Sequence, residues 1–502
     1  MTARSRACRQ AAERVLGLAL ACAAAAIAAT PLRADAAQSI VCGSKAGERE
    51  VCAADTSDGV TLVASLGTAA CELGRTWGYD ANGIWVRDGC SAEFSAGAAK
   101  TDAWFGKYAP TQGFKVADTE HGDLSIRVFT YLRYLNENGI DTSYTDSFGN
   151  TKTVDPRHDF ELNKAQITLF GWLASPKFRY SLFVWSSNAT AGLSAQVVVA
   201  GSLFYTINDH LTVGMGIGGG LPGTRSMEGI FPFWLMVDER QIADEFFRPS
   251  YTAGLIANGK IVEGLEYKTM LGNNLSQFGI DAGQLDNTID TFSGALIWMP
   301  TTHEFGRGIG DFEGHDKLAT RVAGHFTHST ETRQGQPTND AFDNVQIRIS
   351  DGNVIFSPGL FAPGLQIEQA RYRMFAVDGG VKYHGFSLDA EYYSRYIDGF
   401  DTRGTGLLPF TDLHDTGYQV QASAMLRPRF LQVYAGFSKI NGQYGDPHDA
   451  RVGLNLFPWK NEALRWNFEY ISLRHSPVGS ITLPYQVGSN GDVFHTSFMV
   501  YF

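Results

Sequence analysis

The chain has 502 residues, of which 19% are charged and 44% hydrophobic, and its formal net charge is −11. An acidic chain lacks the basic surface that nucleic acids require, so we exclude a nucleic-acid partner. Its 33 Phe, 20 Tyr and 55 Gly residues favour aromatic strands joined by tight turns, as in an all-β protein.

The N-terminal segment has the pattern of a secretory signal peptide. Arginines up to Arg14 precede an apolar run over residues 15–29, and residues 34–36 (Ala-Asp-Ala) offer a cleavage site. We expect residues 1–36 to be removed after export. No later stretch has the roughly 18 consecutive apolar residues of a transmembrane helix. An exported chain without such a helix can still span a membrane as a closed barrel.

Four cysteines lie close together after this segment: Cys42, Cys52, Cys71 and Cys90. Clustered cysteines in an exported segment predict two disulfides, with three possible pairings. A zinc site is the alternative, and it is disfavoured because no C-x-x-C pair occurs. We interpret residues 37–96 as a periplasmic module that depends on its bridges, because so short a segment builds only a small core.

The same module contains aromatic residues that allow two interpretations. Paired tryptophans such as Trp77 and Trp85 can stack on sugar rings, which would suit peptidoglycan or another glycan. In a module of this size they more often fill the core, and we favour the core. Residues 97–123, with several Gly and one Pro, are expected to form a linker.

From Leu124 to the C-terminus, residues 124–502, apolar and polar side chains alternate. Ile126 and Val128 share one face of the first strand, while Arg127 and Arg133 share the other. This dyad is typical of a strand with lipid on one side and water on the other, and its length argues against a sandwich. We predict a transmembrane antiparallel β-barrel of sixteen strands, at residues 124–135, 161–173, 177–186, 196–207, 211–217, 250–259, 264–272, 290–299, 318–328, 371–383, 386–397, 414–427, 430–440, 449–457, 463–473 and 492–502.

The last strand has Phe494, Phe498 and Phe502 on one face. This ending resembles the C-terminal signal of bacterial outer-membrane barrels. The resemblance implies that the barrel-assembly machinery recognises Phe502.

The connections between the predicted strands alternate in length. Short turns are expected at residues 174–176, 208–210, 260–263, 384–385, 428–429 and 458–462, and only 300–317 is long on that side. The connections on the other side include 136–160, 218–249, 273–289, 329–370, 398–413 and 474–491. Short periplasmic turns and long surface loops are typical of outer-membrane barrels. An even strand count places both chain ends in the periplasm, where the cysteines can oxidise.

Residues 218–249, the third surface loop, which lies between the fifth and sixth predicted strands, are unusually apolar. Exposing so many apolar side chains is costly, so we expect the loop to fold into the barrel and narrow it. The charged residues expected at this constriction are Arg225, Glu228, Asp238, Glu239, Arg240, Asp244, Glu245 and Arg248. The alternative is a loop that caps the barrel mouth or contacts another subunit.

Two stretches resemble porins of the phosphate-selective (O and P) family. They are residues 114–124, beginning Phe-Lys-Val-Ala-Asp-Thr, and residues 237–249, which contain Val-Asp-Glu-Arg and Asp-Glu-Phe-Phe-Arg-Pro, with Gly254 following. The resemblance implies a sixteen-stranded, homotrimeric diffusion channel in outer-membrane lipid and lipopolysaccharide, with its third loop folded inward. Such channels carry dense arginine and lysine ladders, whereas this chain is acidic overall.

The cysteine-rich module has its own resemblance, to a small bacterial exported domain of unknown function. It rests on Cys71, residues 77–80 (Trp-Gly-Tyr-Asp), residues 83–86 (Gly-Ile-Trp-Val), Cys90 and Phe94.

No motif indicates catalysis, a cofactor or a metal. Residues 214–219 match G-x-G-x-x-G, but no βαβ context supports a nucleotide. His325 and His328 point to opposite faces of a strand, and no G-x-S-x-G elbow occurs. We therefore predict no enzyme activity, no cofactor and no metal. A barrel hydrolase assembled from distant Ser, His and Asp residues is the less favoured alternative.

On the strand face opposite the apolar residues, basic side chains outnumber acidic ones. The predicted lumen-lining bases are Arg127, Arg133, Lys164, Arg179, Lys268, Arg321, Lys382, Arg395, Arg427, Arg451 and Arg465. The acids on that face are Glu266, Asp378, Asp389, Glu391 and Glu469. A charge that lines a narrow passage acts on an ion more than a loop charge beyond a Debye length of about 8 Å.

We therefore predict an outer-membrane porin of a Gram-negative bacterium. It would allow passive diffusion of small hydrophilic solutes with a weak preference for anions. The alternative function is an outer-membrane anchor whose N-terminal module binds peptidoglycan or another glycan.

Overall fold

The computed structural model describes residues 38–56, 60–67, 69–73, 75–80, 83–96, 107–187, 196–278, 282–285, 288–337, 346–480 and 482–502. The predicted signal peptide, residues 1–36, lies outside these ranges. The chain forms two compact units, one ending at Phe105 and the other beginning at Gly106. None of the helices in the described ranges is long and apolar enough to cross a membrane.

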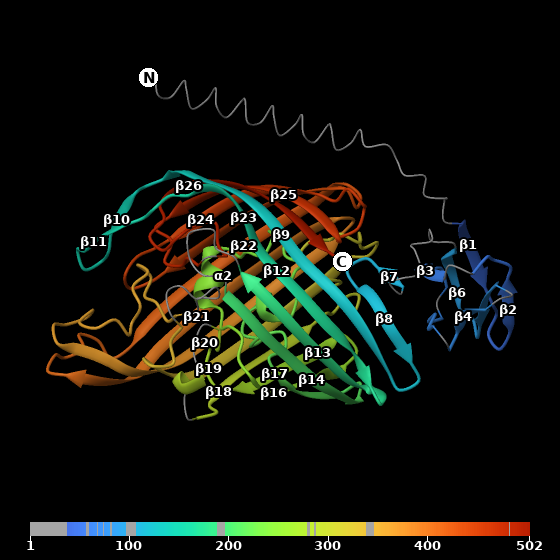
Figure 1. The fold of residues 1–502 in the computed structure, drawn as a ribbon, viewed down its shortest axis with the longest axis horizontal. Helices are drawn as coiled ribbons and strands as arrows, with labels where there is room; N and C mark the ends of the chain where they lie inside the picture. Colours follow the sequence, from blue (N-terminus) through green and yellow to red (C-terminus); the bar gives the residue numbers. More distant parts are fainter. Residues whose placement is uncertain are drawn as a thin grey trace, which may run out of the picture. The chain divides into compact units, whose positions relative to one another are not determined.

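The first unit is a small all-β module built from two antiparallel sheets (Figure 1). One sheet has the order β1 (Gln38–Gly43), β6 (Ser91–Ala96) and β3 (Val60–Ser65). The other has the order β2 (Arg49–Cys52), β5 (Gly83–Arg87) and β4 (Trp77–Asp80). The buried side chains between them are Cys42, Trp77, Ile84, Val86, Cys90, Ala92 and Phe94.

Two disulfides connect the module, as predicted. They pair Cys42 with Cys52 and Cys71 with Cys90, which selects one of the three possible pairings. Both bridges adjoin the buried cluster, so the bridges supplement a core that is small.

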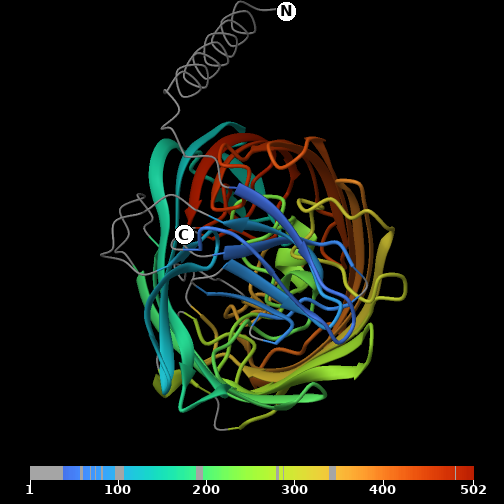
Figure 2. The ribbon, with the colours of Figure 1, turned by 90° about the vertical axis from the view of Figure 1, so that its right-hand side faces the viewer.

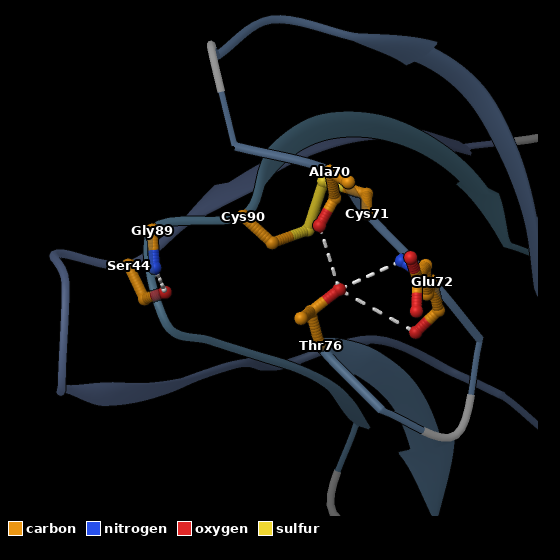
Figure 3. Close-up of a disulfide and its surroundings, with 7 residues drawn as sticks. All are labelled: Ser44, Ala70, Cys71, Glu72, Thr76, Gly89 and Cys90. Carbon is orange, nitrogen blue, oxygen red and sulfur yellow. Dashed lines mark hydrogen bonds between the residues drawn. A yellow bond between two sulfur atoms is a disulfide. The ribbon is translucent and has the colours of Figure 1, made fainter. Parts of the chain in front are cut away.

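Figure 3 shows how a single hydroxyl shapes the loop next to the Cys71–Cys90 bridge. Thr76 Oγ1 donates a hydrogen bond to the carbonyl oxygen of Ala70 (2.9 Å) and accepts one from the backbone N–H of Glu72 (2.7 Å). The hydroxyl therefore satisfies backbone groups that no strand pairs with at this position.

The two tryptophans of the module have different surroundings. Trp77 is buried, and its ring lies 4.8 Å from that of Phe94, so it is a core residue. Trp85 is only partly buried and lies over Gly78, where a Cβ would approach the indole to 2.4 Å. The Arg49 guanidinium lies 5.2 Å from the Trp85 ring.

The second unit is a closed antiparallel β-barrel, and Figure 2 shows its strands as a ring. Among the described residues, sixteen strands form the wall, as predicted. They are β9 (Gly122–Ile140), β12 (His158–Leu173), β13 (Ser175–Ser187), β14 (Gln196–Asn208), β15 (Leu211–Gly216), β16 (Gly254–Val262), β17 (Leu265–Gly272), β18 (Thr291–Trp298), β19 (Ala319–Thr332), β20 (Leu365–Tyr383), β21 (Phe386–Gly404), β22 (Leu413–Arg427), β23 (Leu431–Asn441), β24 (His448–Leu456), β25 (Leu464–Arg474) and β26 (Gly491–Tyr501).

The barrel closes where β26 pairs with β9, for example Thr496 opposite Tyr134. Beyond the end of β26, β8 (Gly113–Thr119) pairs with the remaining edge of β9, and β7 (Tyr108–Ala109) pairs with β8. The segment 113–119, expected as part of a linker, is therefore a strand. An edge with unpaired backbone groups favours such an addition.

Side chains alternate across the wall. Outward-facing apolar residues such as Leu132 and Val377 are more than half exposed (55% and 57%), which suits a surface facing lipid. Inward-facing residues such as Arg133 and Arg451 are buried in the interior.

Short elements also occur in the long connections. β10 (Ser143–Thr145) and β11 (Thr151–Thr153) form a hairpin between β9 and β12. The connection between β15 and β16 contains a 3₁₀ turn (Arg225–Met227) and α2 (Ile242–Phe247), which lies inside the ring of strands in Figure 2.

Candidate functional site

The third loop, residues 218–249, lies inside the barrel, where most of its residues are buried. Its apolar side chains form two clusters with the wall. Val237 packs against Phe129, Tyr131, Met499 and Tyr501. Leu235, Trp234 and Met236 pack against Tyr434 and Ile309. Removing this surface from water favours the inward position of the loop, as its composition predicts.

Side chains from the wall satisfy backbone groups of the loop. Arg465 Nη1 donates a hydrogen bond to the carbonyl oxygen of Trp234 (2.6 Å), and Asn455 Nδ2 donates to that of Leu235 (2.9 Å). An irregular segment in a buried environment needs such partners, because each unpaired backbone group is costly.

The helix α2 packs on the neighbouring part of the wall, from β20 to β24. Phe247 stacks on Tyr393 with ring centroids 5.1 Å apart, and its carbonyl oxygen accepts a hydrogen bond from Tyr372 Oη (2.7 Å). The Arg395 guanidinium lies 4.0 Å from the Phe246 ring. The loop therefore contacts the barrel on at least two sides.

All eight charged residues expected at the constriction are buried within the barrel, and most form ion pairs. Asp238 pairs with Lys164 of β12 (2.6 Å), and Glu245 pairs with Arg248 (2.5 Å). Arg240 lies 3.4 Å from Glu245 and stacks over Trp234. Pairing offsets part of the free-energy cost of burying each charge, which would be high for a lone cation or carboxylate.

Two other members of that set, Arg225 and Glu228, contact the β19–β21 wall. Glu228 accepts hydrogen bonds from Arg321 (2.6 and 3.0 Å), and the backbone N–H of Arg225 donates to Glu391 (2.8 Å). Burial alone would raise the pKa of Glu228, but the guanidinium groups of Arg321 and Arg225 outweigh it and hold this pKa below its ordinary value. For Asp244, burial prevails and raises the pKa.

A second segment, the inner turn at residues 299–318, also enters the barrel. It joins β18 to β19 at the end where the other turns are short. The carbonyl oxygen of Gly308 accepts hydrogen bonds from Arg225 Nη2 (2.8 Å) and from Lys382 Nζ (3.1 Å). The N–H of Ile309 donates to Phe233 (3.2 Å). The sequence showed that this turn is long but did not predict its inward position; its apolar Phe305 and Ile309, both buried, were the available signal.

A cavity of about 210 Å³ remains between the third loop and the wall. Its charged lining comprises four cations and two carboxylates: Arg127, Lys164, Arg240, Arg248, Asp238 and Glu245. Its aromatic lining comprises Phe183, Trp185, Phe231, Trp234, Tyr251 and Phe278.

Arg127 differs from the other cations of this cavity. Its guanidinium lies over the rings of Phe170 (4.9 Å) and Tyr501 (5.1 Å), and no carboxylate among the described residues forms an ion pair with it. Lys164, in contrast, is paired with Asp238. A cation without a carboxylate partner leaves its charge available to a passing anion.

The eleven basic residues predicted to line the lumen fall into three groups by exposure. Those buried in the interior are Arg133, Lys164, Arg321, Lys382, Arg395, Arg451 and Arg465. Arg127 and Lys268 are partly buried, and Arg179 and Arg427 are exposed. Most of the buried group bind carboxylates or loop carbonyls, such as Arg133 with Glu161 (2.6 Å).

Comparison with known proteins gives one family match and several structural ones. Residues 9–94 match a family described as a protein of unknown function (DUF3011). No curated protein matches this chain.

Several solved barrels are similar in fold. An anion-selective porin from Comamonas acidovorans is 8% identical, with a TM-score of 0.45, covering 76% of this chain and 100% of that one. The outer-membrane channel DcaP of Acinetobacter baumannii is 8% identical (TM-score 0.46), covering 78% and 99%. OmpF of Salmonella typhi is 14% identical (TM-score 0.44), covering 76% and 98%. At such identities and scores, these similarities carry no conclusion about solutes.

Proposed function

We propose that the chain is an outer-membrane porin through which small hydrophilic solutes diffuse past the third loop, with a weak preference for anions. The observation that carries this proposal is the charged cavity between the loop and the wall, where four cations face two carboxylates. A closed barrel with an apolar exterior and a polar interior is the form in which strands cross a bilayer.

The partners follow from the same proposal. The outer apolar face would contact lipid and lipopolysaccharide, two further copies would complete a homotrimer, and Phe502 would be recognised by the assembly machinery. The module at residues 37–96 would lie in the periplasm, where its disulfides persist.

The test is a recording from the purified full-length protein in a planar bilayer. We expect stable conductance steps, and a reversal potential across a KCl gradient whose sign indicates more chloride than potassium passing. Phosphate, sugars and organic acids added as competitors would then identify the solute. A folded barrel without conductance would refute diffusion, and a cation-selective sign would refute the anion preference.

A second candidate function concerns the module. Trp85 lies over Gly78 and is only partly buried, with Arg49 beside its ring. An aromatic ring next to a guanidinium suits an anionic glycan such as peptidoglycan. The full-length protein should then sediment with isolated peptidoglycan, and Trp85→Ala should abolish this co-sedimentation. Substitution of the core residue Trp77 is unsuitable as a control because it would unfold the module. Arg75→Ala, an exposed change, is the matched control.

A further inference from the structure

A side chain of the third loop meets a cross-strand pair of the last two strands inside the barrel. The three residues are Glu239 of the third loop, Glu469 of β25 and His495 of β26, and none of them is exposed to solvent. His495 Nε2 lies 3.0 Å from Glu239 Oε1 and 3.0 Å from Glu469 Oε2. An imidazole nitrogen and two carboxylate oxygens therefore converge on one point.

The hydrogen bonds at this point are incomplete. His495 Nε2 carries at most one hydrogen, and its geometry suits a hydrogen bond with Glu469 Oε2 (3.0 Å). Neither carboxylate oxygen of Glu239 accepts a hydrogen bond from any described residue, although the side chain is fully buried. The Nε2 hydrogen thus serves Glu469, which leaves the buried Glu239 carboxylate without a donor.

The charges are also unbalanced. Arg451 binds Asp449 (2.6 Å) and approaches Glu469 (3.4 Å) and Glu239 (3.6 Å), so three carboxylates surround one guanidinium. Arg133 is the other guanidinium whose charge attracts Glu239, and it is already paired with Glu161. Even with a protonated imidazole, these three carboxylates outnumber the two cations by one, and a divalent cation bound to the neutral imidazole would bring the buried group to zero net charge.

A second cluster of the same residue types provides a comparison within the barrel. There, Glu228, His325 and Asp378 also converge. Arg321 donates two hydrogen bonds to Glu228 (2.6 and 3.0 Å) and two to Asp378 (2.8 and 3.1 Å). Both carboxylates are satisfied by this guanidinium, so the second cluster is complete without a metal.

We propose that Glu239, Glu469 and His495 bind a divalent transition-metal ion, with Zn²⁺ as the probe, and that this ion fastens the third loop to β25 and β26. One imidazole and two carboxylates form a donor set that Zn²⁺ accepts. Zinc bonds of about 2.1 Å in tetrahedral geometry place ligand atoms about 3.4 Å apart, so side chains now 3.0 Å apart need only a small outward shift. The ion displaces the Nε2 proton of the imidazolium, which is released to solvent, and the bound imidazole keeps its other proton on Nδ1.

The experiment uses the full-length protein, folded into detergent with Zn²⁺ or with a chelator and then freed of unbound metal by gel filtration. Because the site is fully buried, we expect uptake during folding and about one zinc per chain by elemental analysis. Glu239→Gln and His495→Asn should each lower the zinc content at least tenfold. His325→Asn, the matched histidine change in the satisfied cluster, should keep it. The zinc-loaded wild type should also show a higher Tm than the chelator-treated protein.

Every result of this experiment either supports or refutes the zinc site. Wild-type barrel that folds in zinc but retains less than about a tenth of an ion per chain refutes the site, as does zinc that survives both Glu239→Gln and His495→Asn. Loss of zinc in His325→Asn alone would place the ion in the other cluster and also refute the proposal. Where His495→Asn fails to fold, the near-isosteric Glu239→Gln on the loop provides the same comparison. Metal binding is measured without reference to conductance, so this inference and the proposed function can fail separately.

Discussion

Replacing Arg127 by Gln should weaken the proposed anion preference of the barrel more than any other single Arg→Gln or Lys→Gln change. Arg127 lines the cavity beside the third loop, and no carboxylate of the described residues pairs with it. The change lowers the cavity lining from four cations to three against the same two carboxylates. A unit charge about 4 Å from an ion contributes about 1 kcal/mol even at the dielectric constant of water. About 1 kcal/mol corresponds to roughly a fivefold change in a ratio of populations.

We therefore expect the chloride-to-potassium permeability ratio to fall about fivefold, measured from reversal potentials across a KCl gradient. Arg427→Gln removes the same charge from an exposed residue at the end of β22 that does not line the cavity, so it is the matched control and should change the ratio little. The cation–π interactions of Arg127 with Phe170 and Tyr501 stabilise the fold by about 0.5–2 kcal/mol each, so we expect the barrel to remain folded without them. An unchanged ratio in folded Arg127→Gln protein, or an equal change in the control, would refute the reasoning.

Three further predictions concern stability. Thiol labelling of denatured, unreduced protein should find no reactive cysteine in the mature chain, and Cys90→Ser should destabilise the module by about 2–4 kcal/mol in denaturant unfolding. Phe247→Ala removes the stack on Tyr393 and should cost about 3–5 kcal/mol, seen as faster proteolysis of the third loop and noisier conductance, whereas exposed Phe148→Ala should do neither. Burial opposes ionisation of Asp146, but hydrogen bonds from Asn150 and Asn353 outweigh it and lower its pKa to about 2. Its contribution is present above about pH 4 and lost as pH falls through 2, so Asp146→Asn should expose the β10–β11 hairpin to protease at pH 7 but make no difference near pH 1.

The strands were predictable because the wall separates two environments with opposite preferences. In β9, Leu132 faces outward and Arg133 inward, and that alternation is visible in the sequence. The ends of the longest strands were not predicted, because the alternation stops before the strand does. The strand β21 continues to Gly404, beyond the expected residue 397, through Asp398 and Asp401. Past the apolar band both faces meet water, so backbone pairing continues without an alternation to reveal it.

The interior was predictable only in part. The apolar content of residues 218–249 predicted that the loop folds inward, because the free energy gained by burying a segment depends on how much apolar side-chain surface it carries. Which wall residue meets which loop residue, such as Arg465 with Trp234, depends on the position of the loop in space, and no sequence period encodes that. The convergence of Glu239 with His495 could not be found either, since 256 positions separate them and neither lies in a motif.

Strand parity alone overstates the positive field inside the barrel. Lys382 and Arg465 donate to carbonyl oxygens of the inner turn and the third loop, and Arg321 is bound by two carboxylates. Both kinds of contact hold the inner segments in place, but only the carboxylates also cancel the charge of the cation that they bind. The field along the passage then depends on the few cations without a carboxylate partner, of which Arg127 is the clearest. A barrel with many inward arginines can accordingly be weakly selective, and a single substitution at Arg127 should change its selectivity more than the loss of any arginine that binds the loop.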